Sequence, residues 1–349
     1  PCYDRRCRNQ GITGSPTDPD KVIRFKVPFT GTTQAEDYLR GKVSFSNSML
    51  EDFVIIKSDG WPTYHLANIV DDHLMRITHV MRAEEWIPSL GKHILLYNAF
   101  GWTPPKFVHL SVILGPDKSK LSKRHGAAYV GDLLDKGFLA DALFNYLALI
   151  GWSPKDDKEI LSREELIQRF DLDGLNPSAG VFDVQKLTWM NGEYIRMLPL
   201  EELISISMPY LKKKGWDKFP DSYLKDVYSL MQTRIKLLSD ICHLGAYFFE
   251  EPTEYDPKGL KKHIKQDIKP YFAELTHQMA EMETFTAHQL EELFRGYTKR
   301  KDIKLRKVIH PVRLAITGMT VGPGLFELME VIGKQKCVER LKRAYSVFF

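Results

Sequence analysis

Apolar and polar positions along the first 114 residues predict strands that alternate with helices. Short apolar runs predict strands at residues 22–27, 53–56, 78–82 and 107–114. Between them, apolar residues recur every three or four positions from Pro62 to Met75 and from Ser89, a candidate N-cap, to Phe100. This alternation predicts a parallel, doubly wound α/β sheet that binds ligands at the ends of its strands.

The pattern becomes helical after the last predicted strand. Ser162 and Glu165 have the spacing of a capping box, and Asp183 can cap a helix that runs through Met190. Gly151 follows another helical stretch as a stop signal. Helical periods are present at residues 132–150, 201–210, 223–240, 258–275, 286–296, 309–317 and 324–332. The remainder of the chain is therefore expected to be almost entirely helical.

Composition narrows the class of protein. The chain has 349 residues and 43% hydrophobic residues, which suggests several domains with ample core material. The net charge is +4, and the basic excess lies after residue 200, where 25 Lys and Arg face 20 Asp and Glu. Four scattered cysteines favour a reducing compartment, and no apolar run is long enough for a membrane helix. We expect a cytoplasmic, non-membrane protein with an acidic partner such as nucleic acid.

The most distinctive stretch is a lysine-rich loop after the strand predicted at residues 107–114. Lys118, Lys120, Lys123 and Arg124 lie within seven residues that contain almost no apolar side chain. Several cations on a loop at the end of a buried strand suit a polyphosphate, because they can stabilise the charge of its leaving group. The alternative is an ordinary solvated basic loop.

A second candidate site lies on the helix predicted at residues 62–75 and the strand that follows it. Tyr64 and Asn68 are one helical turn apart and can bind one small polar ligand, although surface or capping roles are the alternative. The strand delivers Arg82 to its end, where the planar guanidinium can bind a carboxylate through two hydrogen bonds. The alternative for Arg82 is a salt bridge to Glu84 or Glu85.

Several segments resemble glutamyl-tRNA synthetases of the bacterial type, and they follow one another along the chain in the same order as in that family. These enzymes are class I aminoacyl-tRNA synthetases. The Lys120-Leu-Ser-Lys-Arg124 segment resembles the Lys-Met-Ser-Lys-Ser signature of class I enzymes. The other segments that carry the resemblance are residues 64–75, 80–86, 95–102 and 181–192. The helical C-terminal part also resembles this family, whereas glutaminyl-tRNA synthetases have β-barrel anticodon domains.

The resemblance implies roles for the candidate residues. Tyr64, Asn68 and Arg82 are expected to bind L-glutamate, with Arg82 at its side-chain carboxylate. Backbone groups near Val112 and Ile113 are expected to bind the adenine of ATP. Lys123 is expected to be the ammonium that follows the departing pyrophosphate, and Lys120 supports it.

The resemblance also implies a domain order and a nucleic-acid partner. It places the end of an acceptor-binding insertion at residues 1–57, the second half of a Rossmann-type catalytic domain at 58–118, a stem-contact domain at 119–199 and an all-helical anticodon-binding domain at 200–349. A basic cluster in the last domain is a candidate contact for tRNA(Glu), with a solvated face as the alternative. This cluster comprises Lys299, Arg300, Lys301, Lys304, Arg306 and Lys307.

The start of the sequence departs from the family pattern. Tyr3 and Cys7 match positions that help to hold zinc in some members, but the upstream Cys-x-Cys is absent, so we expect no metal site. None of the 11 histidines lies in the His-x-Gly-His signature of class I enzymes. We therefore expect that the chain lacks the first catalytic half and makes no glutamyl-adenylate alone.

The function that these patterns predict is ATP-dependent ligation of glutamate to tRNA(Glu). ATP and Mg²⁺ are the expected cofactors, and the enzyme is expected to be a monomer in the cytoplasm rather than in an organelle. A non-catalytic tRNA-binding fragment and a synthetase-like tRNA-modifying enzyme are the alternatives. Such modifying enzymes lack a long helical C-terminal region, which disfavours the second alternative.

Overall fold

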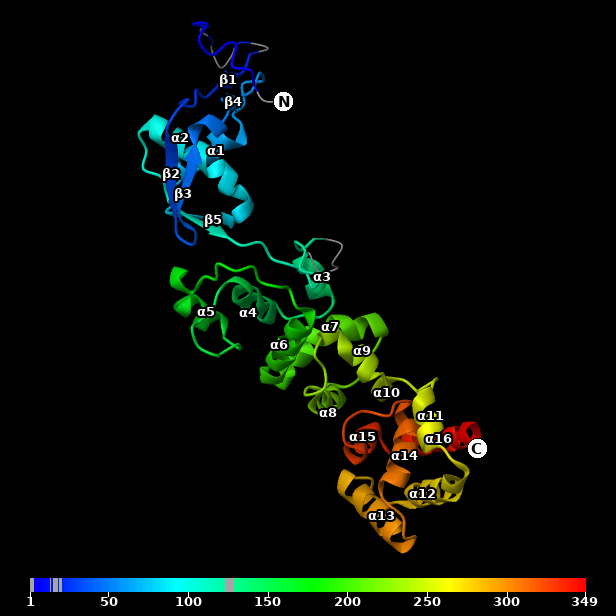
Figure 1. Ribbon diagram of the computed structural model, residues 1–349. Helices are drawn as coiled ribbons and strands as arrows, with labels where there is room; N and C mark the ends of the chain where they lie inside the picture. The colour runs from blue at the N-terminus through cyan, green and yellow to red at the C-terminus, as the bar shows by residue number, and fades with distance from the viewer. Residues whose placement is uncertain (1–2, 13, 15–17, 19–20, 123–128) are drawn as a thin grey trace. The chain divides into compact units, whose positions relative to one another are not determined.

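A computed structural model describes residues 3–12, 14, 18, 21–122 and 129–349. The chain forms two compact units (Figure 1). The first comprises residues 1–128 and 147–183, and the second comprises residues 129–146 and 184–349. All the strands lie in the first unit, and the described residues of the second form helices joined by turns and loops.

The first unit is built on a four-stranded sheet with the strand order β3-β2-β6-β5. Its strands are β2 (Thr32–Asp37), β3 (Gly41–Ser46), β5 (His79–Ala83) and β6 (Lys106–Leu110). The β5, β6 and β2 strands are parallel neighbours, whereas β3 pairs with β2 in an antiparallel hairpin. The all-parallel sheet predicted from the sequence is therefore wrong at this edge.

The β2–β3 hairpin was not predicted because its buried side chains are small or polar. Thr33, Ala35 and Asp37 are buried on β2, while the residues between them are exposed. This is the two-residue alternation of a strand, but it lacks the large apolar residues that usually reveal it. Gly91 of the covering helix lies close to Phe45 of β3, since a Cβ at Gly91 would lie 2.9 Å from its ring.

Two helices lie beside this sheet (Figure 1). The first, α1 (Tyr64–Leu74), agrees with the predicted helix, and α2 (Ile87–Phe100) packs against both α1 and β2. The α2 helix continues directly from the 3-10 turn η2 (Glu84–Trp86), with a proline in its first turn. Ser89 therefore lies inside the first turn of α2, and the prediction that it is the N-cap is wrong. Proline is tolerated in this turn because the first N–H groups of a helix have no partner within it.

Two predicted strands are shorter in the structure. The β6 strand ends at Leu110, and residues 111–114 leave the sheet, with Leu114 forming isolated bridges to Lys120 and Val181. The β1 strand is only Ile23–Arg24 and pairs with β4 (Val54–Ile56) in a separate sheet. The segment after β6 is therefore held by loop contacts and not by sheet pairing.

A cluster of buried residues packs Val108 of β6 with Trp152, Leu161, Leu166 and Leu175. It involves the end of α4 (Ala140–Gly151), α5 (Arg163–Arg169) and the 3-10 turn η4 (Leu172–Gly174). The predicted capping box of α5 is confirmed, since Ser162 and Glu165 exchange side-chain to backbone hydrogen bonds.

The second unit contains helices that are shorter than predicted in three places. Residues 132–150 form α3 (Val130–Asp135) and α4, because Gly137 has a φ of +99° and its Cα lies against the backbone of residues 238–239. Residues 223–240 form α8 (Asp221–Met231) and η5 (Leu238–Asp240), and residues 258–275 form α11 (Pro257–His263), η6 (Gln266–Ile268) and α12 (Lys269–Glu281). The single helices predicted there are wrong.

The other helices of this unit follow the predicted order, with additions. They are α6 (Val184–Met197), α7 (Leu200–Lys214), α9 (Ile241–Leu244), α10 (Ala246–Phe249), α13 (Ala287–Arg300), α14 (Arg306–Thr317), α15 (Leu325–Ile332) and α16 (Lys334–Phe348). The α9, α10 and α16 helices were not predicted. Among the helices described, none is both long enough and apolar enough to cross a bilayer.

Candidate functional site

The candidate ligand site of the first unit centres on Arg82, near the end of β5. Its Nε donates to His109 Nε2 at 3.1 Å, and its Nη2 lies 3.3 Å from His93 Nδ1. Its Nη1 is buried and has no hydrogen-bond partner among the described residues. A buried guanidinium nitrogen without a partner is costly, so a ligand acceptor at this position would stabilise the site.

The structure brings the other two predicted glutamate-binding residues towards Arg82. The Tyr64 ring lies 4.8 Å from the Trp86 ring, and the Arg82 guanidinium lies 5.5 Å from the centre of that same ring. Burial lowers the pKa of Arg82, while Tyr64 and Asp72 oppose the change. Burial raises the pKa of Asp72, which the Asn68 side chain partly offsets by hydrogen bonding. Tyr64, Asn68 and Arg82 thus share one polar neighbourhood.

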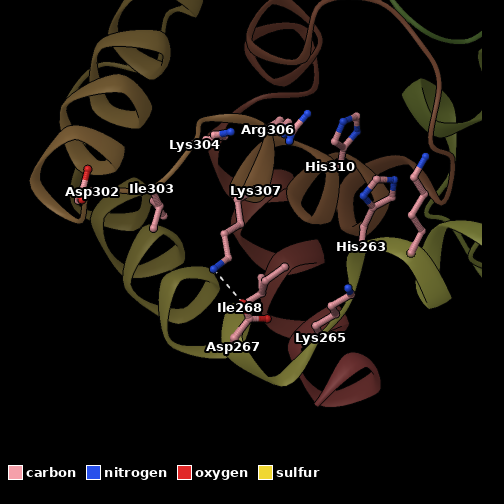
Figure 2. A pocket seen from close by; sticks show the side chains of 11 residues that line it. His263, Lys265, Asp267, Ile268, Asp302, Ile303, Lys304, Arg306, Lys307 and His310 are labelled. Atoms are coloured by element: carbon pink, nitrogen blue, oxygen red, sulfur yellow. Dashed lines mark ion pairs between the residues drawn. The ribbon is translucent and has the colours of Figure 1, made fainter.

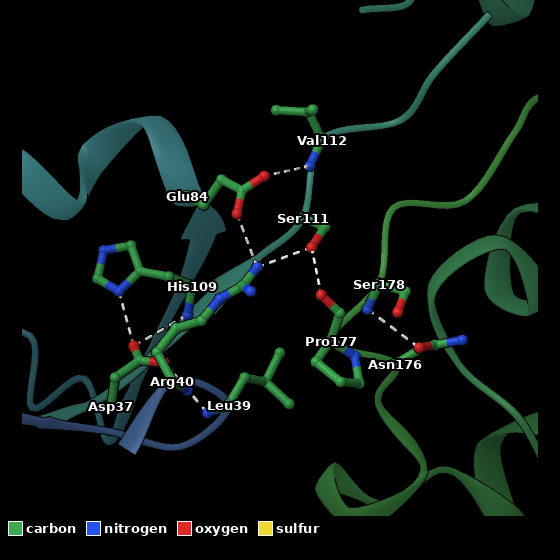
Figure 3. A network of polar contacts seen from close by, with 10 residues as sticks. All are labelled: Asp37, Leu39, Arg40, Glu84, His109, Ser111, Val112, Asn176, Pro177 and Ser178. Carbon is green, nitrogen blue, oxygen red and sulfur yellow. Dashed lines mark hydrogen bonds and ion pairs between the residues drawn. The ribbon is translucent and has the colours of Figure 1, made fainter. Parts of the chain in front are cut away.

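The acidic residues after β5 have partners other than Arg82. Glu84 forms an ion pair with Arg40 at 2.7 Å, and Lys120 lies 2.7 Å from both carboxylate oxygens of Glu85. Arg40 also donates to the Ser111 hydroxyl, which donates to the Pro177 carbonyl (Figure 3). These contacts do not support the salt-bridge alternative for Arg82, whose polar neighbours include His93, His109 and Tyr64.

Four buried or half-buried polar residues behind Arg82 were not predicted as part of the site. Asp37 and His109 are buried, and Asp37 Oδ2 lies 2.7 Å from His109 Nδ1. Figure 3 draws this contact. His93 is also buried, and its Nε2 lies 3.0 Å from His65 Nδ1. The sequence signal that could have revealed them is a polar residue at a core position, such as His93 between Leu90 and Leu96 or His109 within β6.

The predicted adenine-binding backbone lies just after β6. The Val112 N–H lies 3.4 Å from Glu84, and the Ile113 carbonyl accepts from the Leu121 N–H at 2.8 Å. Leu114 is bonded through both backbone groups to the segment at residues 180–182. These contacts hold the extended segment without the support of a neighbouring strand.

The predicted pyrophosphate loop is only partly described. Lys120 is exposed and paired with Glu85, whereas Lys123 and Arg124 lie outside the described residues. An exposed ion pair contributes about 0 to 1 kcal/mol, so Lys120 can leave Glu85 for a phosphate at little cost.

The predicted basic cluster of the second unit borders a pocket of about 730 Å³ (Figure 2). Lys304, Arg306 and Lys307 line it, whereas Lys299, Arg300 and Lys301 are not among its lining residues. Lys307 pairs with Asp267 at 2.8 Å, and Lys301 pairs with Glu274 at 2.7 Å. The sequence reasoning missed the opposite wall, to which Lys262, His263 and Lys265 contribute.

Metal-binding groups are sparse in what the structure describes. No group of three or more His, Cys, Asp or Glu side chains there could hold a metal ion. The Tyr3 hydroxyl accepts from the Cys7 N–H at 3.2 Å, and Cys7 is an exposed free thiol.

Comparison with known families matches both parts of the chain. Residues 2–189 match the catalytic domain of class I tRNA synthetases for glutamate and glutamine (E and Q), and residues 202–345 match an anticodon-binding domain. The chain belongs to this family of class I tRNA synthetases.

Within that family, the chain is a homologue of glutamate–tRNA ligases. It is 46% identical to glutamate–tRNA ligase 1 of Syntrophomonas wolfei over 93% of the chain, and 41% identical to the ligase of Moorella thermoacetica over 99%. The chain spans 66% and 72% of the lengths of these two proteins. The chain is also similar to a crystal structure of a glutamate tRNA ligase from Elizabethkingia meningosepticum in complex with its amino acid, with a TM-score of 0.86 and 36% sequence identity. The match covers 94% of this chain and 68% of that chain.

Proposed function

We propose that this chain serves ATP-dependent ligation of L-glutamate to tRNA(Glu). The family match and the glutamate–tRNA ligase relatives support this activity. The single structural observation that carries it is the buried Arg82 Nη1, which has no partner among the described residues and is suited to an anionic side chain. Neither alternative predicted from the sequence is favoured by these relatives.

The glutamate site comprises Tyr64, Asn68 and Arg82. The Arg82 guanidinium receives the side-chain carboxylate, because two parallel charge-assisted hydrogen bonds match the geometry of the two groups. Tyr64 and Asn68 provide neutral polar groups for the rest of the amino acid. The relative from Elizabethkingia meningosepticum, solved with its amino acid, supports a site of this class.

The ATP site comprises the backbone near Val112 and Ile113, with Lys120 and Lys123 at the phosphates. A carboxylate oxygen of glutamate attacks the α-phosphorus, the bond to the β-phosphate breaks, and the lysines stabilise the departing pyrophosphate. A ribose hydroxyl of tRNA then attacks the carbonyl carbon and releases AMP. Mg²⁺ would be bound mainly by the ATP phosphates, and these lysines would share its charge-neutralising role.

The basic cluster is a contact for the phosphates of tRNA. Lys304 and Arg306 are exposed at the pocket of the second unit, and basic residues from α11 and from the position just before η6 also line it (Figure 2). Exposed lysines and arginines bind nucleic acid largely by releasing counterions, without reading its sequence. We expect the enzyme to act as a cytoplasmic monomer.

The test is pyrophosphate exchange by the full-length protein with ATP, tRNA and L-glutamate, with L-glutamine and L-aspartate as controls. Lys123→Ala should lower glutamate-dependent exchange by about 100-fold or more and leave tRNA affinity within about twofold. Lys42→Ala, exposed on β3, is the matched control and should change exchange little. Unchanged exchange in Lys123→Ala would remove Lys123 from its role, and absence of exchange in the wild type would exclude ligase activity.

A further inference from the structure

The hydrogen bonds around Arg82 fix the proton positions of the two histidines that hold it. Arginine has only donors, so His109 Nε2 and His93 Nδ1 must both be unprotonated acceptors. His109 must then carry its proton on Nδ1, which donates to Asp37, and His93 must carry its proton on Nε2, which donates to His65 Nδ1. Each histidine therefore acts as a neutral acceptor for the guanidinium.

Asp37 is well suited to impose this arrangement on His109. Its Oδ2 accepts from both the backbone N–H and Nδ1 of His109, at 3.0 and 2.7 Å. Its Oδ1 accepts from the backbone N–H groups of Leu39 and Arg40 at 3.1 and 2.9 Å (Figure 3). A carboxylate that already accepts from three backbone N–H groups can only accept, so His109 must present a protonated Nδ1 to it.

Burial supports the same protonation states independently. His109 and His93 are 0% and 1% exposed. Burial lowers the pKa of His109, and it lowers the pKa of His93 to about 3. Both imidazoles therefore remain neutral at physiological pH, and neither competes with Arg82 for an anionic ligand.

We propose that His109 and His93 are positioning residues that hold the Arg82 guanidinium in one orientation, which leaves Nη1 without a protein partner for the ligand to bind, and that this orientation sets the preference for glutamate over glutamine. This inference rests on the proposed function. A carboxylate accepts from two guanidinium nitrogens, whereas a carboxamide offers one acceptor and turns an NH₂ donor towards Arg82. A guanidinium held through both Nε and Nη2 cannot rotate to avoid that donor.

The experiment replaces each acceptor in the full-length enzyme. His109→Phe and His93→Phe should each raise the KM for glutamate by about tenfold or more, with the KM for ATP within about twofold. The ratio of kcat/KM for glutamate to that for glutamine should fall by about tenfold. His109→Gln retains a side-chain acceptor and should recover most of both losses. His73→Phe, which keeps a ring against Trp102, is the matched control and should leave all of these values unchanged.

Folded phenylalanine variants that keep the wild-type glutamate KM and the wild-type discrimination would overturn the inference. Equal increases in the KM values for glutamate and ATP would also overturn it, because they would indicate general damage to the site. A wild-type enzyme without glutamate-dependent exchange would instead contradict the proposed function.

Nitrogen NMR of the histidine rings provides a readout that does not depend on activity. The wild type should show His109 protonated on Nδ1 alone and His93 on Nε2 alone. Asp37→Asn should shift the His109 proton to Nε2, because the asparagine amide can donate to Nδ1. The same change of aspartate to asparagine gives the wrong histidine tautomer in Ser-His-Asp triads. A wild-type His109 that carries its proton on Nε2 would contradict the inference.

Discussion

Arg82 in the first unit and Arg340 in the second are both arginines whose pKa is lowered by burial, yet their donors are used differently. Arg340 binds backbone carbonyls through both terminal nitrogens, with Nη1 on Tyr247 and Ile316 and Nη2 on Glu250. Arg82 instead uses Nε and Nη2 on two neutral imidazoles and keeps the terminal Nη1 without a protein partner among the described residues.

Under the proposed function, this difference separates a structural arginine from a ligand-binding one. Arg340 connects α16 to α14 and to α10, so its charge is neutralised by carbonyl dipoles that already belong to the fold. Arg82 is oriented by side chains that leave its charge uncompensated on one side. Arg340 also keeps its Nε without a partner among the described residues, so the useful criterion is whether both terminal nitrogens are already bonded, and burial alone does not distinguish the two roles.

The largest effect that tests this comparison is on stability. Arg340→Met should lower the free energy of unfolding by about 3 kcal/mol, because it leaves three carbonyls without this donor, and two of these contacts are buried. Arg82→Met should lower it by about 1 kcal/mol or less, because the loss of its hydrogen bonds to His93 and His109 is offset by the removal of a desolvated charge that has an unpartnered nitrogen. Urea denaturation would measure both, with the exposed Arg343→Met as control. Equal losses in the Arg340 and Arg82 variants would contradict the distinction.

The second effect is on substrate binding. Arg82→Lys should raise the KM for glutamate by about 10- to 100-fold and the KM for ATP by less than about threefold, because an ammonium cannot form the two parallel bonds of a guanidinium. Steady-state kinetics of pyrophosphate exchange would measure this, with the exposed Arg76→Lys as control. Equal increases for both substrates would indicate that Arg82 is structural, like Arg340.

Sequence reasoning located Arg82 but not the residues that orient it. Arg82 lies near the end of a recognisable strand, and Tyr64 and Asn68 have the spacing of one helical turn. Their neighbourhood could therefore be predicted. Asp37 lies on β2, whose buried positions are Thr, Ala and Asp, and this pattern does not resemble a hydrophobic strand. Its partner His109 is 72 residues away, a pairing that only the folded sheet determines.

The helical part illustrates the same limit. The α5 capping box was predicted because all of its hydrogen bonds lie within four residues. The break between α3 and α4 was missed because Gly137 packs against the backbone at Leu238 and Ser239, about a hundred positions along the chain. Local signals identify caps and periods, whereas the positions where helices are interrupted depend on contacts that are distant in the sequence.

A third test uses the neutral histidines of the first unit. The charged and titratable groups near His93 are Arg82, His65, His109 and Lys92, and the Tyr64 ring lies 6.3 Å away. Its pKa falls from 6.5 to about 3 on folding, so below about pH 6.5 the unfolded chain takes up a proton that the folded chain does not. The free energy of unfolding should therefore decrease as the pH is lowered, and at pH 5 it should be about 2 kcal/mol smaller because of this group alone.

Urea denaturation at pH 7, 6 and 5 would measure this loss. His93→Asn should remove the contribution of this histidine, so the variant should lose less stability than the wild type between pH 7 and pH 5. Parallel pH profiles for the two proteins would indicate that His93 is protonated in the fold, which is incompatible with its role as an acceptor for Arg82.

The smallest expected effect concerns the exposed cations of the second unit, where no single residue should dominate. Lys304→Gln and Arg306→Gln should each weaken tRNA binding by only about two- to fivefold near 0.1 M salt, because each loses one solvated phosphate contact. Each should also reduce the slope of log affinity against log salt by about one, whereas Lys342→Gln, exposed on α16, should not. Binding measured across a salt series would show both changes. A 100-fold loss of tRNA affinity in either variant, with an unchanged salt slope, would indicate that the residue makes one oriented contact, as Arg82 is proposed to do. The contrast between the two units would then be wrong.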